Sequence, residues 1–163
     1  MKRIILLIGV PGSGKTTLAA KIAQKGFTIL NADSIRQELY GDAGEQGEPE
    51  AVFKIFFERM EKLMEQGTDL IIDNTNANPK HRKQILDRAK QFEYNDVQLW
   101  LLDTPLAVCI ARNKNRQRVV GEDIVANMHM TLNRSGRPSR EEGKLVLIRP
   151  GVDENDYRFF FPN

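Results

Sequence analysis

The apolar positions of this chain follow two spacings that alternate along the sequence. Short and mainly apolar runs, which suit buried strands, occupy residues 4–8, 27–30, 70–73, 97–102 and 145–148. Between these runs, apolar side chains recur every three or four residues, the spacing of an amphipathic helix, within residues 18–23, 51–64, 85–92 and 124–132. Alternating strands and helices are typical of a parallel sheet covered on both faces. We therefore predict one α/β domain over residues 1–163, with a central parallel sheet of about five strands.

Polar residues mark where several of these helices are expected to begin. Asn78-Pro79 and Asp103-Thr104-Pro105 each place a capping side chain before a proline, which favours a helix start. The second strand is expected to close at Asn31-Ala32-Asp33, with a helix following from Ser34. The aromatic tail at 157–161 is expected to pack against the body of the domain.

Composition narrows the class of protein. With 40% hydrophobic and 28% charged residues, the chain resembles an ordinary globular domain. No apolar stretch approaches the ~20 residues of a membrane span, so we expect no membrane partner. The single cysteine, Cys109, cannot form an internal disulfide, which favours a reducing compartment and predicts a cytoplasmic protein. Cys109 lies in an apolar helical run and is interpreted as buried; the aromatic stripe Phe53, Phe56 and Phe57 is interpreted as core.

The charge is unevenly distributed. The net charge is only +2, but residues 104–140 carry seven Lys and Arg against two acidic residues. Such a segment suits a surface that faces phosphates. A solvated basic face is the alternative explanation.

The first apolar run leads directly into a recognisable loop. Residues 9–16, GVPGSGKT, fit the pattern G-x-x-x-x-G-K-[ST] and are followed by the helical spacing at 18–23. Glycines let such a backbone curl until its N–H groups point at a phosphate, and the following helix N-terminus favours an anion. Lys15 can reach β- and γ-phosphates, and the Thr16 hydroxyl suits Mg²⁺. The alternative, a glycine-rich turn with a stray lysine, is disfavoured because motif and context agree.

This loop predicts a P-loop NTPase fold of the kinase type that binds ATP and Mg²⁺. The residues predicted to bind the nucleotide are Gly9, Pro11, Gly12, Ser13, Gly14, Lys15, Thr16, Thr17 and Arg112.

Two acidic residues follow the second and third predicted strands. Because parallel strands end at one edge of their sheet, Asp33 and Asp73 are expected beside the bound phosphate. Asp33 is the candidate general base of a kinase, with a helix N-cap as the alternative. Asp73 is the candidate that handles Mg²⁺ with Thr16, and it is also expected on the substrate side of the site; a turn-forming aspartate is the alternative.

Arginines suggest a lid over the phosphates. Arg112 and Arg116 lie four residues apart and would share a helix face if the helix continued that far. A basic lid at roughly 112–121 could close over the nucleotide and supply cations to the transition state. His81 and His129 lie in positions that do not suggest catalysis.

The chain resembles the 5′-kinase domain of phage polynucleotide kinase, within the zeta-toxin-like group of P-loop kinases. The landmarks are residues 9–17, 31–36, 73–82, 111–116, 119–128 and 142–143. The resemblance implies that Asp33 is the general base, that Arg36 contacts the substrate's phosphate, and that Arg116 stabilises the transferring phosphoryl group. The phage domain reads Asp-Thr-Asn after its third strand, so in that register its acid falls on Asn74, one residue beyond Asp73.

We therefore expect an ATP-dependent kinase, with a polynucleotide 5′-hydroxyl as the acceptor and catalytic roles for Lys15, Asp33 and Arg116. The first alternative is a kinase of a small-molecule alcohol such as a sugar, a nucleoside or another metabolite. The second is a nucleotide-hydrolysing switch without an acceptor. A switch needs no acceptor base, so Asp33 argues against it.

Overall fold

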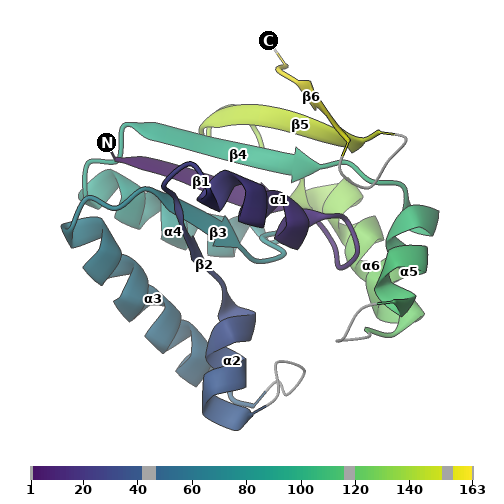
Figure 1. Cartoon of the computed structure of the whole chain (residues 1–163), viewed down its shortest axis with the longest axis horizontal. Helices are drawn as coiled ribbons and strands as arrows, with labels where there is room; N and C mark the ends of the chain where they lie inside the picture. Colours follow the sequence, from purple (N-terminus) through teal and green to yellow (C-terminus); the bar gives the residue numbers. More distant parts are fainter. Residues whose placement is uncertain (1, 42–46, 116–119, 152–155, 163) are drawn as a thin grey trace.

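A six-stranded sheet forms the centre of the molecule in the computed structural model, which describes residues 2–41, 47–115, 120–151 and 156–162. The strands are β1 (Arg3–Ile8), β2 (Thr28–Leu30), β3 (Leu70–Asp73), β4 (Asp96–Leu102), β5 (Lys144–Pro150) and β6 (Tyr157–Phe160). Their spatial order is β2-β3-β1-β4-β5-β6 (Figure 1). The first five pair in parallel, which confirms the predicted α/β class.

The sixth strand is the aromatic tail, which pairs antiparallel with β5 at the edge of the sheet. Its side chains are half-buried to exposed. Trp100 of β4 packs edge-on against Phe159, with ring centroids 5.8 Å apart. The tail therefore packs against the body as expected, and it does so as a strand.

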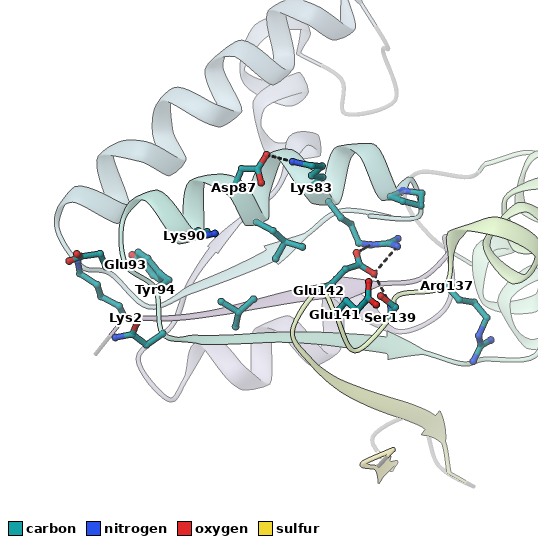
Figure 2. A pocket seen from close by; sticks show the side chains of 15 residues that line it. Lys2, Lys83, Asp87, Lys90, Glu93, Tyr94, Arg137, Ser139, Glu141 and Glu142 are labelled. Atoms are coloured by element: carbon teal, nitrogen blue, oxygen red, sulfur yellow. Dashed lines mark hydrogen bonds and ion pairs between the residues drawn. The ribbon is translucent and has the colours of Figure 1, made fainter.

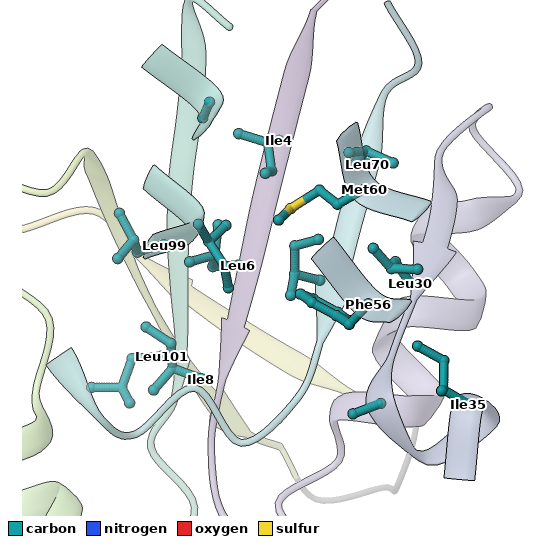
Figure 3. Packing of buried hydrophobic residues seen from close by; sticks show 14 of the residues in the cluster. Ile4, Leu6, Ile8, Leu30, Ile35, Phe56, Met60, Leu70, Leu99 and Leu101 are labelled. Carbon is teal, nitrogen blue, oxygen red and sulfur yellow. The ribbon is translucent and has the colours of Figure 1, made fainter. Parts of the chain in front are cut away.

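Helices cover the two faces of the sheet. They are α1 (Lys15–Ala23), α2 (Ala32–Tyr40), α3 (Pro49–Glu65), α4 (Pro79–Gln91), α5 (Leu106–Lys114) and α6 (Glu122–Thr131), and a π-helical turn η1 (Leu132–Gly136) extends α6. Ile4, Leu6 and Ile8 of β1 pack with the buried residues of α2 to α6 and η1, as Figure 3 shows for Phe56 and Met60 of α3. Ile5 and Leu7 point to the other face, toward α1. Because residues 4–8 of β1 are buried on both faces of the sheet, they form an unbroken apolar run.

Helix starts decide how the site is built. Asn78 caps α4 as predicted, accepting a hydrogen bond from Lys80 N at 2.9 Å. Helix α2 begins at Ala32, two residues earlier than expected, because the Asn31 side chain caps it by accepting from Ser34 N at 2.7 Å. The expected cap at Asp103-Thr104 is wrong: Pro105 occupies the N-cap position of α5 without a side-chain hydrogen bond.

Within the described ranges, no helix is both long and apolar enough to cross a membrane.

Candidate active site

The loop from β1 to α1 curls tightly around Gly12. This residue has φ +83°, and a Cβ placed on it would lie 2.2 Å from the carbonyl oxygen of Cys109. A side chain is therefore excluded both by the left-handed backbone and by the close approach of α5. Ser13 N donates to Val10 O at 3.1 Å and closes the curl.

Lys15 and Thr16 open helix α1 directly after this loop. Lys15 Nζ reaches back across the loop and donates to Val10 O at 3.3 Å. Thr16 Oγ1 lies 3.5 Å from Asp73 Oδ2, so the end of β3 meets the start of α1. The positive end of the α1 dipole faces the same point. The structure thus brings together the nucleotide-side residues that the sequence analysis named.

Helix α5 supports the loop from behind. Thr104 is buried and, in place of capping α5, donates its hydroxyl to Ser13 O at 2.9 Å. The Arg112 guanidinium lies about 3.5 Å from the position of a Cβ added to Gly14, which places it beside the loop as predicted. Cys109 is fully buried, and this burial raises the pKa of its thiol to about 11.

Asp33 and Arg36 lie on the first two turns of α2 and form an ion pair of 2.8 Å. The Asp33 side chain is 43% exposed, whereas that of Arg36 is 14% exposed. Both line a cavity of about 890 Å³ that also contains Lys15, Thr16 and Asp73. Because Asn31 caps α2, the interpretation of Asp33 as the helix N-cap is wrong; Asp33 lines the cavity instead.

The segment after β3 joins the parts of the site, and sequence reasoning missed most of its role. Asn74 Oδ1 accepts from Ala32 N at 2.9 Å and so holds the start of α2. Thr75 O accepts from Gly9 N at 3.1 Å and holds the start of the phosphate loop. The buried Asn76, at φ +52°, donates from Nδ2 to Leu7 O at 2.7 Å. A polar run after a strand is the one signal in the sequence, and it does not say which backbone group each side chain reaches.

Aromatic residues form one wall of the cavity. Phe56 is fully buried, as the core interpretation requires. Phe53 and Phe57 pack against the core with part of their surface and line the cavity with the rest. The His81 ring of α4 lies with its centroid 5.8 Å from that of Phe53. The stripe therefore serves both the core and the cavity.

The opposite wall belongs to α6 and the residues before it, namely Val120, Gly121, Ile124 and Met128. Within the described residues, helix α5 ends at Lys114, two positions before Arg116. Arg116 and residues 116–119 of the predicted lid lie outside the described residues. On either side of that segment, Asn113 and Val120 exchange two hydrogen bonds, with Val120 N to Asn113 Oδ1 at 3.2 Å.

The basic segment at 104–140 divides between several environments. Arg112 lies at the phosphate loop, whereas Lys114 pairs with Glu122 of α6 at 3.0 Å. Arg137 lies in a larger hollow of about 1200 Å³ along α4, shown in Figure 2. That hollow also contains Lys2 and Tyr94, which precede β1 and β4, and none of the predicted site residues lines it. The volume of a cavity therefore does not identify the candidate site. The site is identified by the smaller cavity, where the motif residues converge.

Comparison with known proteins agrees with this arrangement. The profile of the AAA domain family (AAA_33) matches residues 4–135. A protein of Autographa californica nuclear polyhedrosis virus, provisionally named bifunctional polynucleotide kinase/RNA ligase, is 28% identical over 129 residues, covering 71% of this chain and 18% of that protein. L-seryl-tRNA(Sec) kinase of Methanococcus maripaludis is 25% identical over 139 residues, covering 82% of this chain and 53% of that protein.

The chain thus spans about half or less of the length of these curated relatives. Among solved structures, a chain of the Pnkp1/Rnl/Hen1 RNA repair complex superposes with a TM-score of 0.71 at 22% identity, covering 80% of this chain and 44% of that one. At this identity the likeness concerns the fold. The family match covers most of the chain and contains the phosphate loop, Asp33, Asp73 and Arg112. The chain therefore belongs to the AAA domain family and has the P-loop kinase fold.

Proposed function

We propose that this protein is an ATP-dependent kinase that transfers the γ-phosphate to the 5′-hydroxyl of a polynucleotide. The observation that carries the proposal is one cavity lined by the phosphate-loop residues Lys15 and Thr16 and by the Asp33–Arg36 pair. A nucleotide switch needs only the phosphate-loop residues Lys15 and Thr16, whereas a kinase also needs a group that receives the acceptor's proton. The polynucleotide kinase named among the relatives supports the same choice of acceptor.

The nucleotide side fits ATP with Mg²⁺. The hydroxyl of Thr16 and the carboxylate of Asp73 lie 3.5 Å apart at the mouth of the loop, and oxygen atoms of these kinds are the ligands that Mg²⁺ prefers. Thr16 and Asp73 would hold the ion, which neutralises charge on the β- and γ-phosphates. Lys15, with its ammonium group above the loop, places a further cation on the same phosphates.

On the acceptor side, Asp33 receives the proton of the attacking hydroxyl. Arg36 Nη1 donates to Asp33 Oδ1 at 2.8 Å, and this charge-assisted bond fixes the position of the carboxylate at the cavity. Within the described part of the chain, the buried Arg36 Nε has no hydrogen-bond partner, so this side chain retains a donor for a phosphate of the acceptor. We place Arg116 on the transferring phosphoryl group, as the family resemblance implies.

The aromatic wall favours an acceptor that carries a flat ring. A nucleobase that stacks on Phe53 or Phe57 gains about 1–3 kcal/mol, and a sugar without a base gains none of it. One observation favours a smaller acceptor, a small-molecule alcohol: the three acidic residues of the cavity lining, Asp33, Glu50 and Asp73, outnumber the two basic ones, Lys15 and Arg36. A cavity without excess positive charge suits one or two phosphates of the acceptor, not a long polyanion.

The test offers ATP labelled on the γ-phosphate together with a 5′-hydroxyl oligonucleotide. The parent protein should label it, and should leave an oligonucleotide that already carries a 5′-phosphate unlabelled. Asp33→Asn should lose transfer on the order of 10²–10⁴-fold while ATP affinity changes little, because only the proton acceptor is lost. A matched control is Asp87→Asn, an exposed aspartate of α4 paired with Lys83, which should transfer at the parental rate.

Each competing account gives a different result in this experiment. Near-parental transfer by Asp33→Asn would remove Asp33 as the base. ATP binding without labelling of any acceptor by the parent would favour the switch. Labelling of a sugar or nucleoside in preference to the oligonucleotide would favour the small-alcohol kinase.

A further inference from the structure

Arg82 is the largest fully buried side chain of the molecule's described part, with 1% exposure, and none of the roles above uses it. It lies in the first turn of α4, and its guanidinium points inward. Nε donates to Glu142 Oε1 at 2.7 Å, and Nη2 lies 3.4 Å from Glu142 Oε2. Nη1 donates to two backbone carbonyls, Asn76 O at 2.8 Å and Gly136 O at 2.6 Å.

The first of these carbonyls belongs to the segment that assembles the site. This segment, residues 74–78, holds the start of α2 through Asn74, the start of the phosphate loop through Thr75, and the end of β1 through Asn76. Asp33 and Arg36 are on α2, so a shift of the segment would displace the acceptor-side pair relative to the phosphates.

The second carbonyl belongs to the end of the opposite wall. Gly136 closes η1, the continuation of α6, whose residues Ile124 and Met128 line the cavity. A Cβ on Gly136 would lie 2.3 Å from Ala77 O, so η1 is packed directly on residues 74–78. Arg82 is the donor that bonds to both segments at this contact.

Glu142 completes the arrangement from the loop before β5. Its carboxylate pairs with Arg82 and also accepts from Ser139 N at 2.7 Å, one of the bonds drawn in Figure 2. Burying a charged pair costs desolvation energy, and apolar residues of similar size often stabilise a fold as well or better. A guanidinium is suited to fixing four acceptors at set angles, because its planar fork is rigid.

We propose that Arg82 is a positioning residue for phosphoryl transfer. Through Asn76 O, Gly136 O and Glu142, it holds residues 74–78 and the end of the α6–η1 wall in one arrangement, so that the Asp33–Arg36 pair faces the phosphate loop at the correct distance. The inference rests on the proposed kinase function. It predicts that loosening this contact slows the chemical step and leaves nucleotide binding intact.

The test compares Arg82→Lys, Glu142→Gln and Gly136→Ala with the control Arg3→Lys. Each protein is assayed at a temperature well below its own Tm. Lysine at position 82 keeps the charge but cannot reach Asn76, Gly136 and Glu142 at once. Glutamine at position 142 keeps the shape of the glutamate. Alanine at position 136 disturbs the packing of η1 on Ala77 and leaves the Arg82 side chain itself unchanged. Arg3 forms another arginine–carboxylate pair, with Asp69 at 2.7 Å, at the opposite end of β1. The rate is followed as ADP release, which reports transfer to any acceptor, water included.

We expect Arg82→Lys, Glu142→Gln and Gly136→Ala each to lower kcat by about ten- to a hundredfold, since misplacements near 1 Å can cost this much. KM for ATP should stay within about twofold. Hydrogen exchange of residues 74–78 and 132–136 should rise together in all three variants and remain parental in Arg3→Lys.

A purely structural role predicts something else: a lower Tm, as in Arg3→Lys, with kcat within about twofold of the parent. That result in Glu142→Gln and Gly136→Ala would overturn the proposal even if Arg82→Lys failed to fold. A parent that releases ADP but ignores the oligonucleotide would overturn the proposed acceptor, and the comparison of kcat among these variants would still decide the role of Arg82.

Discussion

Lys15 lies at the first position of α1, where its ammonium group already contacts a backbone oxygen of the loop, Val10 O. A cation held there would lie beside the β- and γ-phosphates of a nucleotide bound in the curl around Gly12. The sequence motif predicted this placement fully, because the loop, the strand before it and the helix after it are contiguous in the chain. Roles that depend on contiguous residues are the ones that a single sequence can give.

Lys15→Ala should therefore abolish measurable phosphoryl transfer and leave the fold intact. The parent should gain thermal stability in millimolar ATP and Mg²⁺, since a ligand at 100 times its Kd stabilises by about 2.7 kcal/mol. Calorimetry on both proteins checks this. An unchanged Tm of the parent in ATP would argue against nucleotide binding at this loop.

Cys109 shows how burial can outweigh nearby cations in setting the reactivity of a thiol. Its pKa is raised from 9.0 to about 11, chiefly because the thiolate would be buried. The folded state therefore keeps the proton to higher pH than the unfolded chain does. This stabilising contribution is complete below about pH 9 and is lost as the pH rises through 11, with a total on the order of 2–3 kcal/mol.

The measurement is the free energy of unfolding of the parent and of Cys109→Ala as a function of pH. The difference between the two should be constant up to about pH 8 and should shrink between about pH 9 and 11. Thiol-directed reagents should react slowly with the native parent at pH 8, because the thiolate is the reacting form. A constant difference up to pH 11 would contradict the raised pKa.

At the scale of elements, helix starts explain most of the differences between expectation and structure. The residue patterns at 78–79 and 103–105 are alike, yet Asn78 caps its helix and Thr104 does not. Thr104 donates to Ser13 O, 91 positions away, and such a partner leaves no local signal in the sequence. Asn31 caps α2 although Asp33 and Ser34 are equally good candidates by residue type, so the sequence alone does not identify the cap.

Asn31→Ala tests this assignment. Loss of the cap on α2 should lower the free energy of unfolding by about 1 kcal/mol, because Ser34 N loses its acceptor. Asn31→Asp is the matched control, since aspartate caps about as well as asparagine. Urea unfolding of the three proteins gives the comparison through the shift in midpoint. Equal midpoints for the alanine variant and the parent would show that Asn31 does not carry the cap.

Across the whole molecule, the apolar spacing predicted the five parallel strands and their helices, because each run is local and each of these strands contributes side chains to the buried core. The sixth strand was expected only as a packed tail, since its exposed phenylalanines follow no strand spacing with a buried face. The contact of Arg82 with Asn76, Gly136 and Glu142 was not predicted at all. It joins Arg82 to residues up to 60 positions away, and only the three-dimensional fold brings them together.

The central claim is that this arrangement phosphorylates a polynucleotide 5′-hydroxyl. The most direct measurement places a 5′-hydroxyl oligonucleotide in competition with sugars and free nucleosides at equal concentration, with limiting labelled ATP. The ratio of labelled products gives the ratio of kcat/KM values. Stacking on the aromatic wall and a phosphate contact to Arg36 should each favour the oligonucleotide over a simple sugar by about tenfold or more. Most of the label on the oligonucleotide is the predicted result; most of it on a sugar or free nucleoside would contradict the account.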